Sequence, residues 1–279
     1  MGQLVLLAES NGVATLVLNR PEKLNAFGED MREQIAESLD AAAAHGGIRV
    51  LVLTGAGRAF SAGGDVHFMA ALKQRGASFD AMRPLVEGGR AVIQKLAALP
   101  FPTLAAVNGP AAGGGLNLAL ACDLRIASDQ ATFGETFARI GLHPDWGGTY
   151  FLPRLVGLAH ALELCWTGDM IDAAEALRIG LVNRVVPAPE LAQAGQALAA
   201  RLAAAPQASV RLAKRNLGAS FQRTLAACLD AETEAMAACW NSPDAAEGIR
   251  AFAEKRAPAF GTGAAGGLGG PTRSGRRFE

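Results

Sequence analysis

The chain has 279 residues, half of them apolar, and its 26 basic and 26 acidic side chains give a formal net charge of zero. A chain of this size can bury a large core, and its charge balance offers no general field for nucleic acid or an anionic membrane. Its apolar runs end well short of the roughly 20 residues that a membrane span needs. The N-terminus lacks the basic segment and cleavage site of a secretory signal. We therefore expect a cytoplasmic protein with no nucleic-acid or membrane partner.

The cysteines and histidines form no recognisable metal or nucleophile motif. Cys122, Cys165, Cys228 and Cys239 lie in apolar stretches without a CxxC pair, so buried free thiols are expected. The four histidines include no HExxH pattern and no evident partner for a catalytic thiol. No metal site is expected.

The first half of the chain alternates predicted strands with predicted helices. Apolar runs at 4–8 and 13–19 flank Ser10-Asn11-Gly12, which is typical of a hairpin turn. The further elements expected in this half are a helix at 29–45, strands at 50–54 and 103–108, and helices at 79–99 and 116–121. Such alternation predicts a largely parallel sheet covered by helices, with ligands at the carboxyl ends of its strands.

The second half is predicted to be mostly helical. Helices are expected at 173–179, 190–204, 208–217, 224–240 and 245–256, with one extended piece at 181–186. We expect a core domain over 1–200, a helical C-terminal region over 201–260, and a disordered tail over 261–279, whose apolar content is low. Amphipathic helices of this kind can also pack across a subunit boundary.

Two glycine-rich loops each follow a predicted strand. The loop from Gly55 to Asp65 has Phe60 where a dinucleotide fingerprint needs glycine, and it has no GK[ST] phosphate loop. The loop at Gly113-Gly114-Gly115 opens a helix, so its amides can point outward. Two such loops can bring two backbone N–H groups to one oxygen and form an oxyanion hole. The alternative is that these glycines only make tight turns.

Five segments in order resemble the signatures of the enoyl-CoA hydratase/isomerase (crotonase) family. They are Asn19 to Ala26 (NRPEKLNA), Leu53 to Asp65 (LTGAGRAFSAGGD), Ala105 to Gly115 (AAVNGPAAGGG), Ala121 to Ser128 (ACDLRIAS) and Gly141 to Gly157 (GLHPDWGGTYFLPRLVG). The resemblance covers about residues 3 to 260. It implies an α/β fold, a crotonase-like spiral of repeated β-β-α units with a helical C-terminal trimerisation region. It also implies a homotrimer or a hexamer made as a dimer of trimers.

The same resemblance assigns roles at the site. The amides of Gly64 and Gly114 would bind the carbonyl of a coenzyme A thioester, which is the substrate, and no cofactor would be permanently bound. The residues placed at the substrate and CoA are Lys23, Leu24, Ala26, Ala62, Gly63, Asp65, Val66, Gly113, Phe137 and Trp146. Phe60 and Phe68 are further aromatics that could line the pocket or belong to the core.

This sequence departs from the hydratase pattern at both catalytic glutamates. The corresponding positions hold Asn117 and Phe137, and neither side chain exchanges a proton at neutral pH. Ordinary hydration by two carboxylates is therefore opposed by the sequence. Glu135 could replace a missing glutamate through a shift of register, although a capping role in the first turn of a helix is preferred.

One acid remains in the signature that faces the substrate, Asp145 in HPDWGG. This pattern resembles the 1,2-epoxyphenylacetyl-CoA isomerases of phenylacetate degradation, in which an aspartate here moves the proton. The 4-chlorobenzoyl-CoA dehalogenases also carry an aspartate here and use it as a nucleophile. Asp145 could instead only cap the following helix. We expect an enoyl-CoA double-bond isomerase with Asp145 as acid and base; the alternatives are an enoyl-CoA hydratase of fatty-acid or aromatic-acid degradation and a catalytically silent acyl-CoA-binding paralogue.

Overall fold

The computed structural model describes residues 2–28 and 30–261. The chain divides into two compact units between Ala203 and Ala204, close to the boundary expected after residue 200. Each unit is described by itself. The tail expected at 261–279 lies outside the described residues, apart from Gly261.

A six-stranded sheet forms the centre of the first unit. Its strands are β1 (Val5–Ser10), β2 (Val13–Leu18), β3 (Val50–Gly55), β4 (Thr103–Val107), β6 (Leu124–Ser128) and β9 (Arg184–Val186), in the order β1-β2-β3-β4-β6-β9. Only β1 runs antiparallel to its neighbour. The predicted hairpin is confirmed, and its turn residues Asn11 and Gly12 have φ of 54° and 78°, a left-handed conformation that asparagine and glycine tolerate.

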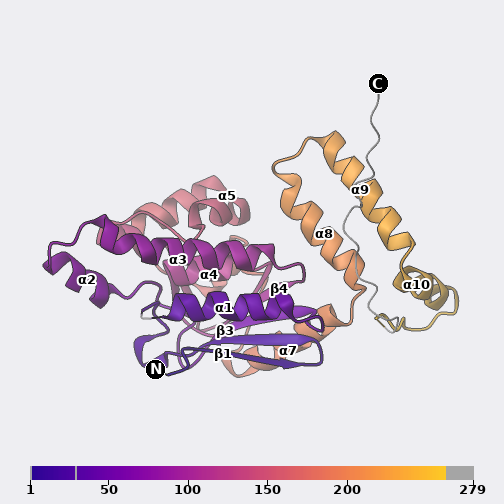
Figure 1. Ribbon diagram of the computed structural model, residues 1–279, viewed down its shortest axis with the longest axis horizontal. Coiled ribbons are helices and arrows are strands. Elements are labelled where there is room, and N and C mark those ends of the chain that lie inside the picture. The colour runs from indigo at the N-terminus through magenta and orange to yellow at the C-terminus, as the bar shows by residue number, and fades with distance from the viewer. Residues whose placement is uncertain (1, 29, 262–279) are drawn as a thin grey trace. The chain divides into compact units, whose positions relative to one another are not determined.

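Helices cover both faces of this sheet (Figure 1). The helices of the unit are α1 (Met31–Ala44), α2 (Val66–Gln74), α3 (Phe79–Ala98), α4 (Gly114–Leu120), α5 (Gly148–Thr167), α6 (Ala173–Arg178) and α7 (Leu191–Ala203). Because side chains alternate along a strand, Val50 and Val52 pack with α7, whereas Leu51 and Leu53 belong to the core that contains α1 and α3. Short 3-10 turns are η1 (Pro21–Lys23), η2 (Thr136–Ile140) and η3 (Ala188–Glu190).

A second, small sheet lies beside the start of α4. It consists of β5 (Ala111–Ala112), β7 (Thr132–Gly134) and β8 (Ile171–Asp172), in the order β5-β7-β8. β5 pairs with β7 in parallel, so the glycine loop after β4 is tied to the segment that leads into Glu135. This pairing brings distant parts of the chain to one place at the site.

In its described part, residues 204–261, the second unit has three helices, α8 (Gln207–Ser220), α9 (Leu225–Trp240) and α10 (Pro243–Ala253). Thr224 and Ser242 cap the last two helices by accepting hydrogen bonds from Ala227 N and Ala245 N. Of the described residues in this unit, Ala251 alone is buried. Large apolar side chains are instead exposed, namely Leu217, Phe221, Leu225, Leu229, Met236, Trp240, Ile249 and Phe252.

The predicted elements agree with the structure except at a few places. The helices α2 and α5 were not anticipated, although the segment of α5 was noted as a motif. The expectation of buried thiols holds for Cys122. It is wrong for Cys165, Cys228 and Cys239, which are only half-buried. Within the described ranges, no helix has the length and apolar character to cross a membrane.

Candidate active site

The two glycine loops touch at the carboxyl ends of β3 and β4, which are adjacent parallel strands. Ser61 N donates to Pro110 O at 3.2 Å, and Ala112 N donates to Ser61 O at 3.0 Å. A Cβ atom at Gly115 would lie 2.4 Å from Ser61 O, so only glycine permits this approach. The loops therefore lie at the carboxyl ends of the strands, as the sequence predicted.

The amides of Gly64 and Gly114 donate to no acceptor within residues 2–28 and 30–261. Gly114 is the first residue of α4, where N–H groups have no partner within the helix. Among the hydrogen bonds of the described residues, none uses the nitrogen of Gly64 or Gly114. A Cβ at Gly63 would lie 3.1 Å from Gly114 N, which places the two loops side by side. The neighbouring amide of Gly113 is already engaged, because it donates to Gly134 O at 2.9 Å.

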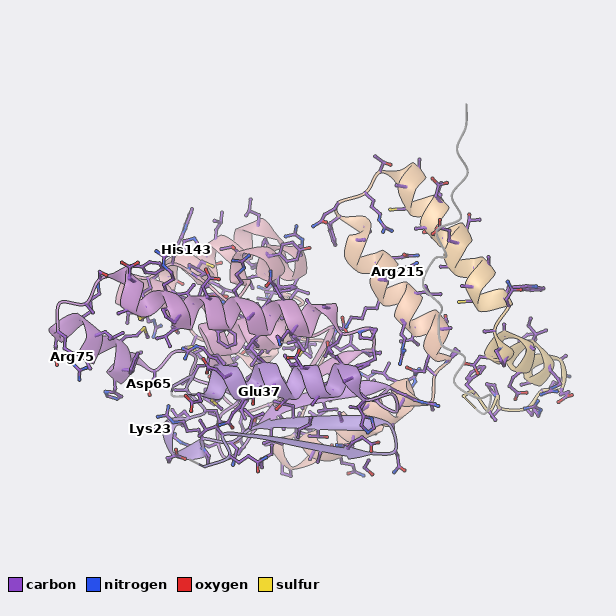
Figure 2. The ribbon with its side chains drawn as sticks, in the orientation of Figure 1. Lys23, Glu37, Asp65, Arg75, His143 and Arg215 are labelled. Atoms are coloured by element: carbon purple, nitrogen blue, oxygen red, sulfur yellow. The ribbon has the colours of Figure 1, made fainter. Side chains whose placement is uncertain are left out.

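The segment that carries Lys23, Leu24 and Ala26 lies against the first glycine loop. Ala62 N donates to Leu24 O at 2.9 Å, and Phe27 N donates to Gly63 O at 2.7 Å. Lys23 is exposed, and Figure 2 shows Lys23 and Asp65 at the same end of the sheet. These contacts bring together most of the residues expected at coenzyme A.

Asp65 has a structural task at this junction. Its carboxylate accepts from Phe68 N at 3.2 Å, which caps α2, and pairs with Arg20 at 3.0 Å. Burial alone would raise its pKa, but the hydrogen bonds from Phe68 N and Arg20 lower the pKa below its usual range. The adjacent Val66 is exposed at the start of α2.

Asn117 links the helix that begins at Gly114 to both nearby acids. Its Nδ2 atom donates to the backbone carbonyl of Asp145 at 2.9 Å and to Glu135 Oε2 at 3.4 Å. A Cβ at Gly148 would lie 2.5 Å from Asn117 Nδ2, so the first residue of α5 must also be small. Asn117 Oδ1 and Glu135 Oε1 are buried and have no hydrogen-bond partner among the described residues.

Asp145 is half-buried in the loop before α5. Burial raises the pKa of its carboxyl to about 6, although the nearby charges of Arg32 and His143 act in the opposite direction. The residue that caps α5 is Gly147, and no side chain of the described residues caps this helix. The capping alternative for Asp145 is therefore not observed.

Glu135 is fully buried, with 0% of its surface exposed. Burial raises its pKa to about 8; the hydrogen bond from Asn117 lowers the pKa, and the charge of Asp145 raises it further. Its side chain makes no capping hydrogen bond to the 3-10 turn η2. The preferred expectation of a capping glutamate was therefore wrong, because the side chain turns inward toward Asn117.

Two aromatic side chains flank the start of α4. Trp146 stacks on Phe27 with ring centroids 4.2 Å apart and an interplanar angle of 11°. A Cβ at Gly114 would lie 3.4 Å from Trp146 Cδ1, and a Cβ at Gly113 would lie 3.4 Å from Phe137 Cε2. The other two candidate aromatics lie elsewhere: Phe60 is fully buried in the core, and Phe68 is 47% exposed.

Arg32 is a buried cation that the sequence reasoning did not identify. It is 6% exposed, and its Nε and Nη1 atoms have no hydrogen-bond partner in the described parts of the chain. Burial lowers its pKa, whereas the nearby carboxylates of Glu33, Asp145 and Asp65 raise it. A Cβ at Gly88 would lie 3.2 Å from Arg32 Cδ. The Gly88-Gly89 pair inside a helix was the available signal that α3 leaves room for side chains from elsewhere.

An open, mostly apolar cavity of about 820 Å³ is lined in part by Gly148. Its lining includes Leu142, His143, Leu152 and Cys165. No cluster of three or more His, Cys, Asp or Glu side chains suited to a metal ion occurs within the described residues.

Comparisons with known proteins agree with this geometry. The family described as "Enoyl-CoA hydratase/isomerase" matches residues 8–263. A probable enoyl-CoA hydratase from Rhodobacter capsulatus is 41% identical over 251 residues, covering 90% of this chain and 95% of the relative. The 1,2-epoxyphenylacetyl-CoA isomerase of Escherichia coli is 39% identical over 267 residues, covering 93% and 99%.

Solved structures give the same result for the fold. A putative enoyl-CoA hydratase/isomerase from Mycobacterium abscessus superposes with a TM-score of 0.87 at 34% identity, covering 92% of this chain and 98% of that structure. The expected α/β spiral fold with its helical C-terminal region is thereby confirmed.

Proposed function

Because the chain belongs to the enoyl-CoA hydratase/isomerase (crotonase) family and is an acyl-CoA enzyme, we propose that it moves the double bond of an enoyl-CoA thioester. Asp145 is the acid and base of this reaction. Family members use acyl-CoA substrates without a bound cofactor, so the protein's own groups must carry the chemistry. The proposal depends on one observation: an acid with a raised pKa lies in a loop that is hydrogen-bonded to α4, the helix that begins at Gly114.

The amides of Gly64 and Gly114 polarise the thioester carbonyl. Neither amide has a protein acceptor among the described residues, and Gly114 is at the positive end of α4. Removal of one such donor costs roughly 3 kcal/mol of transition-state stabilisation in other enzymes. The negative charge that develops on the carbonyl oxygen during enolate formation is therefore stabilised at this point.

The carboxylate of Asp145 takes a proton from C2 of a 3-enoyl thioester. The C–H electron pair moves into the conjugated system, and the negative charge rests on the thioester oxygen. The neutral acid then returns the same proton to C4, which leaves the double bond between C2 and C3. One acid is sufficient, and a pKa of about 6 lets it both accept and return a proton near neutral pH.

Contacts with coenzyme A are proposed for the backbone of Lys23, Leu24 and Ala26 and for the turn from Ala62 to Val66. The support is their arrangement, since Ala62 N donates to Leu24 O and the whole group flanks Gly64. Gly113 and the rings of Phe137 and Trp146, beside the start of α4, are proposed to border the acyl group. The E. coli isomerase is named for an aromatic substrate, which agrees with an aromatic wall of this kind.

The test is an Asp145→Asn variant assayed with 3-enoyl-CoA and 2-enoyl-CoA substrates. We expect kcat for isomerisation of 3-enoyl-CoA to fall by about 10²- to 10⁴-fold, while binding of an unreactive CoA thioester stays within a few-fold. Asp80→Asn, at an exposed aspartate on α3, is the matched control and should leave turnover unchanged. Unchanged isomerisation in Asp145→Asn would refute the assignment.

Hydration is the second candidate. The R. capsulatus relative is named as a probable hydratase, and Glu135 supplies a second acid near Asp145. Formation of 3-hydroxyacyl-CoA from 2-enoyl-CoA at a rate above that of isomerisation would favour it. Binding of acyl-CoA without turnover of either substrate would instead indicate a silent paralogue.

A homotrimer, or a hexamer formed by two trimers, is proposed as the assembly. The support is the row of exposed large apolar side chains on α8, α9 and α10, which a monomer would leave in water. Light scattering during gel filtration should give the mass of three or six chains. A monomeric mass at micromolar concentration would exclude this part of the proposal.

A further inference from the structure

Glu135 and Asn117 leave complementary atoms without a partner. Asn117 Nδ2 already contacts Glu135 Oε2 at 3.4 Å, and the two unpartnered oxygens are the other atom of each group, Glu135 Oε1 and Asn117 Oδ1. Both side chains are fully buried, with 0% exposed. Two oxygens that only accept cannot satisfy one another, and leaving them both buried is costly. A carboxyl that keeps its proton supplies the missing donor, because a neutral acid donates through its hydroxyl.

We propose that Glu135 is a positioning residue that stays protonated at neutral pH and pairs with the side-chain amide of Asn117, which in turn holds the main chain of Asp145. In this pair the amide donates to Glu135 Oε2, and the acid donates from Oε1 to Asn117 Oδ1. The second hydrogen of Asn117 Nδ2 remains for the carbonyl of Asp145, at 2.9 Å. The effect of the Glu135–Asn117 pair on catalysis depends on the role proposed for Asp145, but the protonation state of Glu135 does not.

The pair of Glu135 and Asn117 fixes the main chain of Asp145 relative to α4. Asn117 is in α4, three residues after Gly114, the proposed oxyanion donor. The loop that carries Asp145 is therefore hydrogen-bonded to the same short helix that begins at this donor. A misplacement of about 1 Å can cost about a hundredfold in rate. A neutral Glu135 also spares Asp145 a second negative charge nearby, which would disfavour the carboxylate form that the reaction needs.

The surroundings of Glu135 agree with a neutral acid. The titratable groups that act on it or respond to it are Asp145 and Cys165. The thiol of Cys165 has a pKa raised to about 11, with burial as the main cause, so it stays uncharged up to alkaline pH. The positive charges of Arg32 and His143 act on Asp145 instead. Burial raises the pKa of Glu135 to about 8, so the proton is kept at neutral pH.

The first experiment reads protonation directly and needs no substrate. Infrared difference spectra between pH 7 and pH 9, a range above the pKa of about 6 of Asp145, should contain a carbonyl band of a buried carboxylic acid that disappears at the higher pH. The band should be absent from Glu135→Gln and present in Glu163→Gln, the matched control at an exposed glutamate on α5. Absence of this band from the wild-type protein near pH 7 would overturn the proposal, even if Glu135→Gln failed to fold.

The second experiment separates positioning from proton transfer. Glu135→Gln keeps an uncharged, hydrogen-bonding side chain, so its kcat at pH 7 should stay within about threefold of wild type, whereas Glu135→Ala should lose about tenfold or more. The alkaline fall of the wild-type pH profile, expected near pH 8, should disappear in Glu135→Gln. A loss of activity in Glu135→Gln as large as that in Asp145→Asn would overturn the positioning role.

If the wild-type protein turns over neither enoyl-CoA substrate, the function proposed above fails while the infrared result still decides the state of Glu135. Unfolding in urea provides a further check. From pH 6 to 8 Glu135 should hold more protons in the folded protein than in the unfolded chain, so the free energy of unfolding should fall as pH rises. An equal fall in Glu135→Gln would contradict the proposal.

Discussion

The carboxylates on the two sides of the site have opposite environments. Asp65, at the end of the first glycine loop, accepts hydrogen bonds from Phe68 N and Arg20, and its pKa is lowered. Asp145 and Glu135, on the other side, are desolvated with few donors, and their pKa values are raised to about 6 and about 8. The comparison separates a carboxylate whose charged form is stabilised by hydrogen bonds from two acids whose desolvation favours the protonated form.

The largest effect is expected where the two loops touch. In Gly115→Ala the new Cβ would lie 2.4 Å from the carbonyl oxygen of Ser61, a backbone atom that cannot move away. We expect the free energy of unfolding to fall by about 3 kcal/mol or more, together with loss of turnover. In Gly114→Ala the nearest side-chain atoms lie at 3.4 and 3.5 Å, so stability should be nearly unchanged. Equal urea midpoints for the two variants would contradict this view of the loops.

The next largest effect is expected at the aromatic wall. A Cβ at Gly89 would lie 2.2 Å from Trp146 Nε1, whereas a Cβ at Gly88 meets only the flexible stem of Arg32 at 3.2 Å. Gly89→Ala should therefore displace Trp146 from its stack on Phe27 and cost about 1 to 3 kcal/mol of stability. Gly88→Ala should cost less, since alanine also favours the helix. Thermal unfolding of the two variants side by side gives the comparison.

A moderate effect on the free energy of unfolding is expected at Asp65, at the end of the first glycine loop. Asp65→Asn removes the charge that pairs with Arg20 and weakens the cap of α2, so the free energy of unfolding at pH 7 should fall by about 1 to 2 kcal/mol. Because the folded-state pKa is lowered, this stabilisation is present above the unfolded value of 3.8 and is lost as pH falls through the folded value. The difference between variant and wild type should therefore shrink in acid.

An effect of opposite sign is expected for the stability of Asp145→Asn. The folded-state pKa of Asp145 is raised from 3.8 to about 6, so the folded protein loses stability as pH rises between these values. The variant lacks this loss and should be more stable than wild type at pH 7. A lower stability of Asp145→Asn at pH 7, measured in urea, would place Asp145 with Asp65 as a structural carboxylate.

Much of the fold could be predicted because its longer elements have clear periodicity and strong terminators. The hairpin at Asn11-Gly12 and the helix ended by Pro100 are examples. The strands β5, β7 and β8 have only two or three residues, too few for any periodic pattern. α5 was missed because Pro153 and Gly157 interrupt its pattern, and Gly157 indeed has φ of 78° inside it.

The residues of the candidate site that belong to sequence motifs could be predicted. The buried side chains that contact the site from other elements could be predicted less well. Gly64, Gly114 and Asp145 were chosen from the motifs, and the structure places their loops together. The burial of Glu135 depends on β5 pairing with β7, and the burial of Arg32 depends on the space left by α3. Both are tertiary effects, and of the two only the burial of Arg32 had a signal in the sequence, the Gly88-Gly89 pair.

The stacking of Trp146 on Phe27 gives the site its own spectroscopic signal. The chain has three tryptophans, and the other two, Trp166 and Trp240, are 74% and 69% exposed whereas Trp146 is 5% exposed. Emission from Trp146 should therefore be blue-shifted and shielded from soluble quenchers such as iodide. A fluorescence titration of a Trp166→Phe, Trp240→Phe protein would follow acyl-CoA occupancy beside Gly114 without any chemical label.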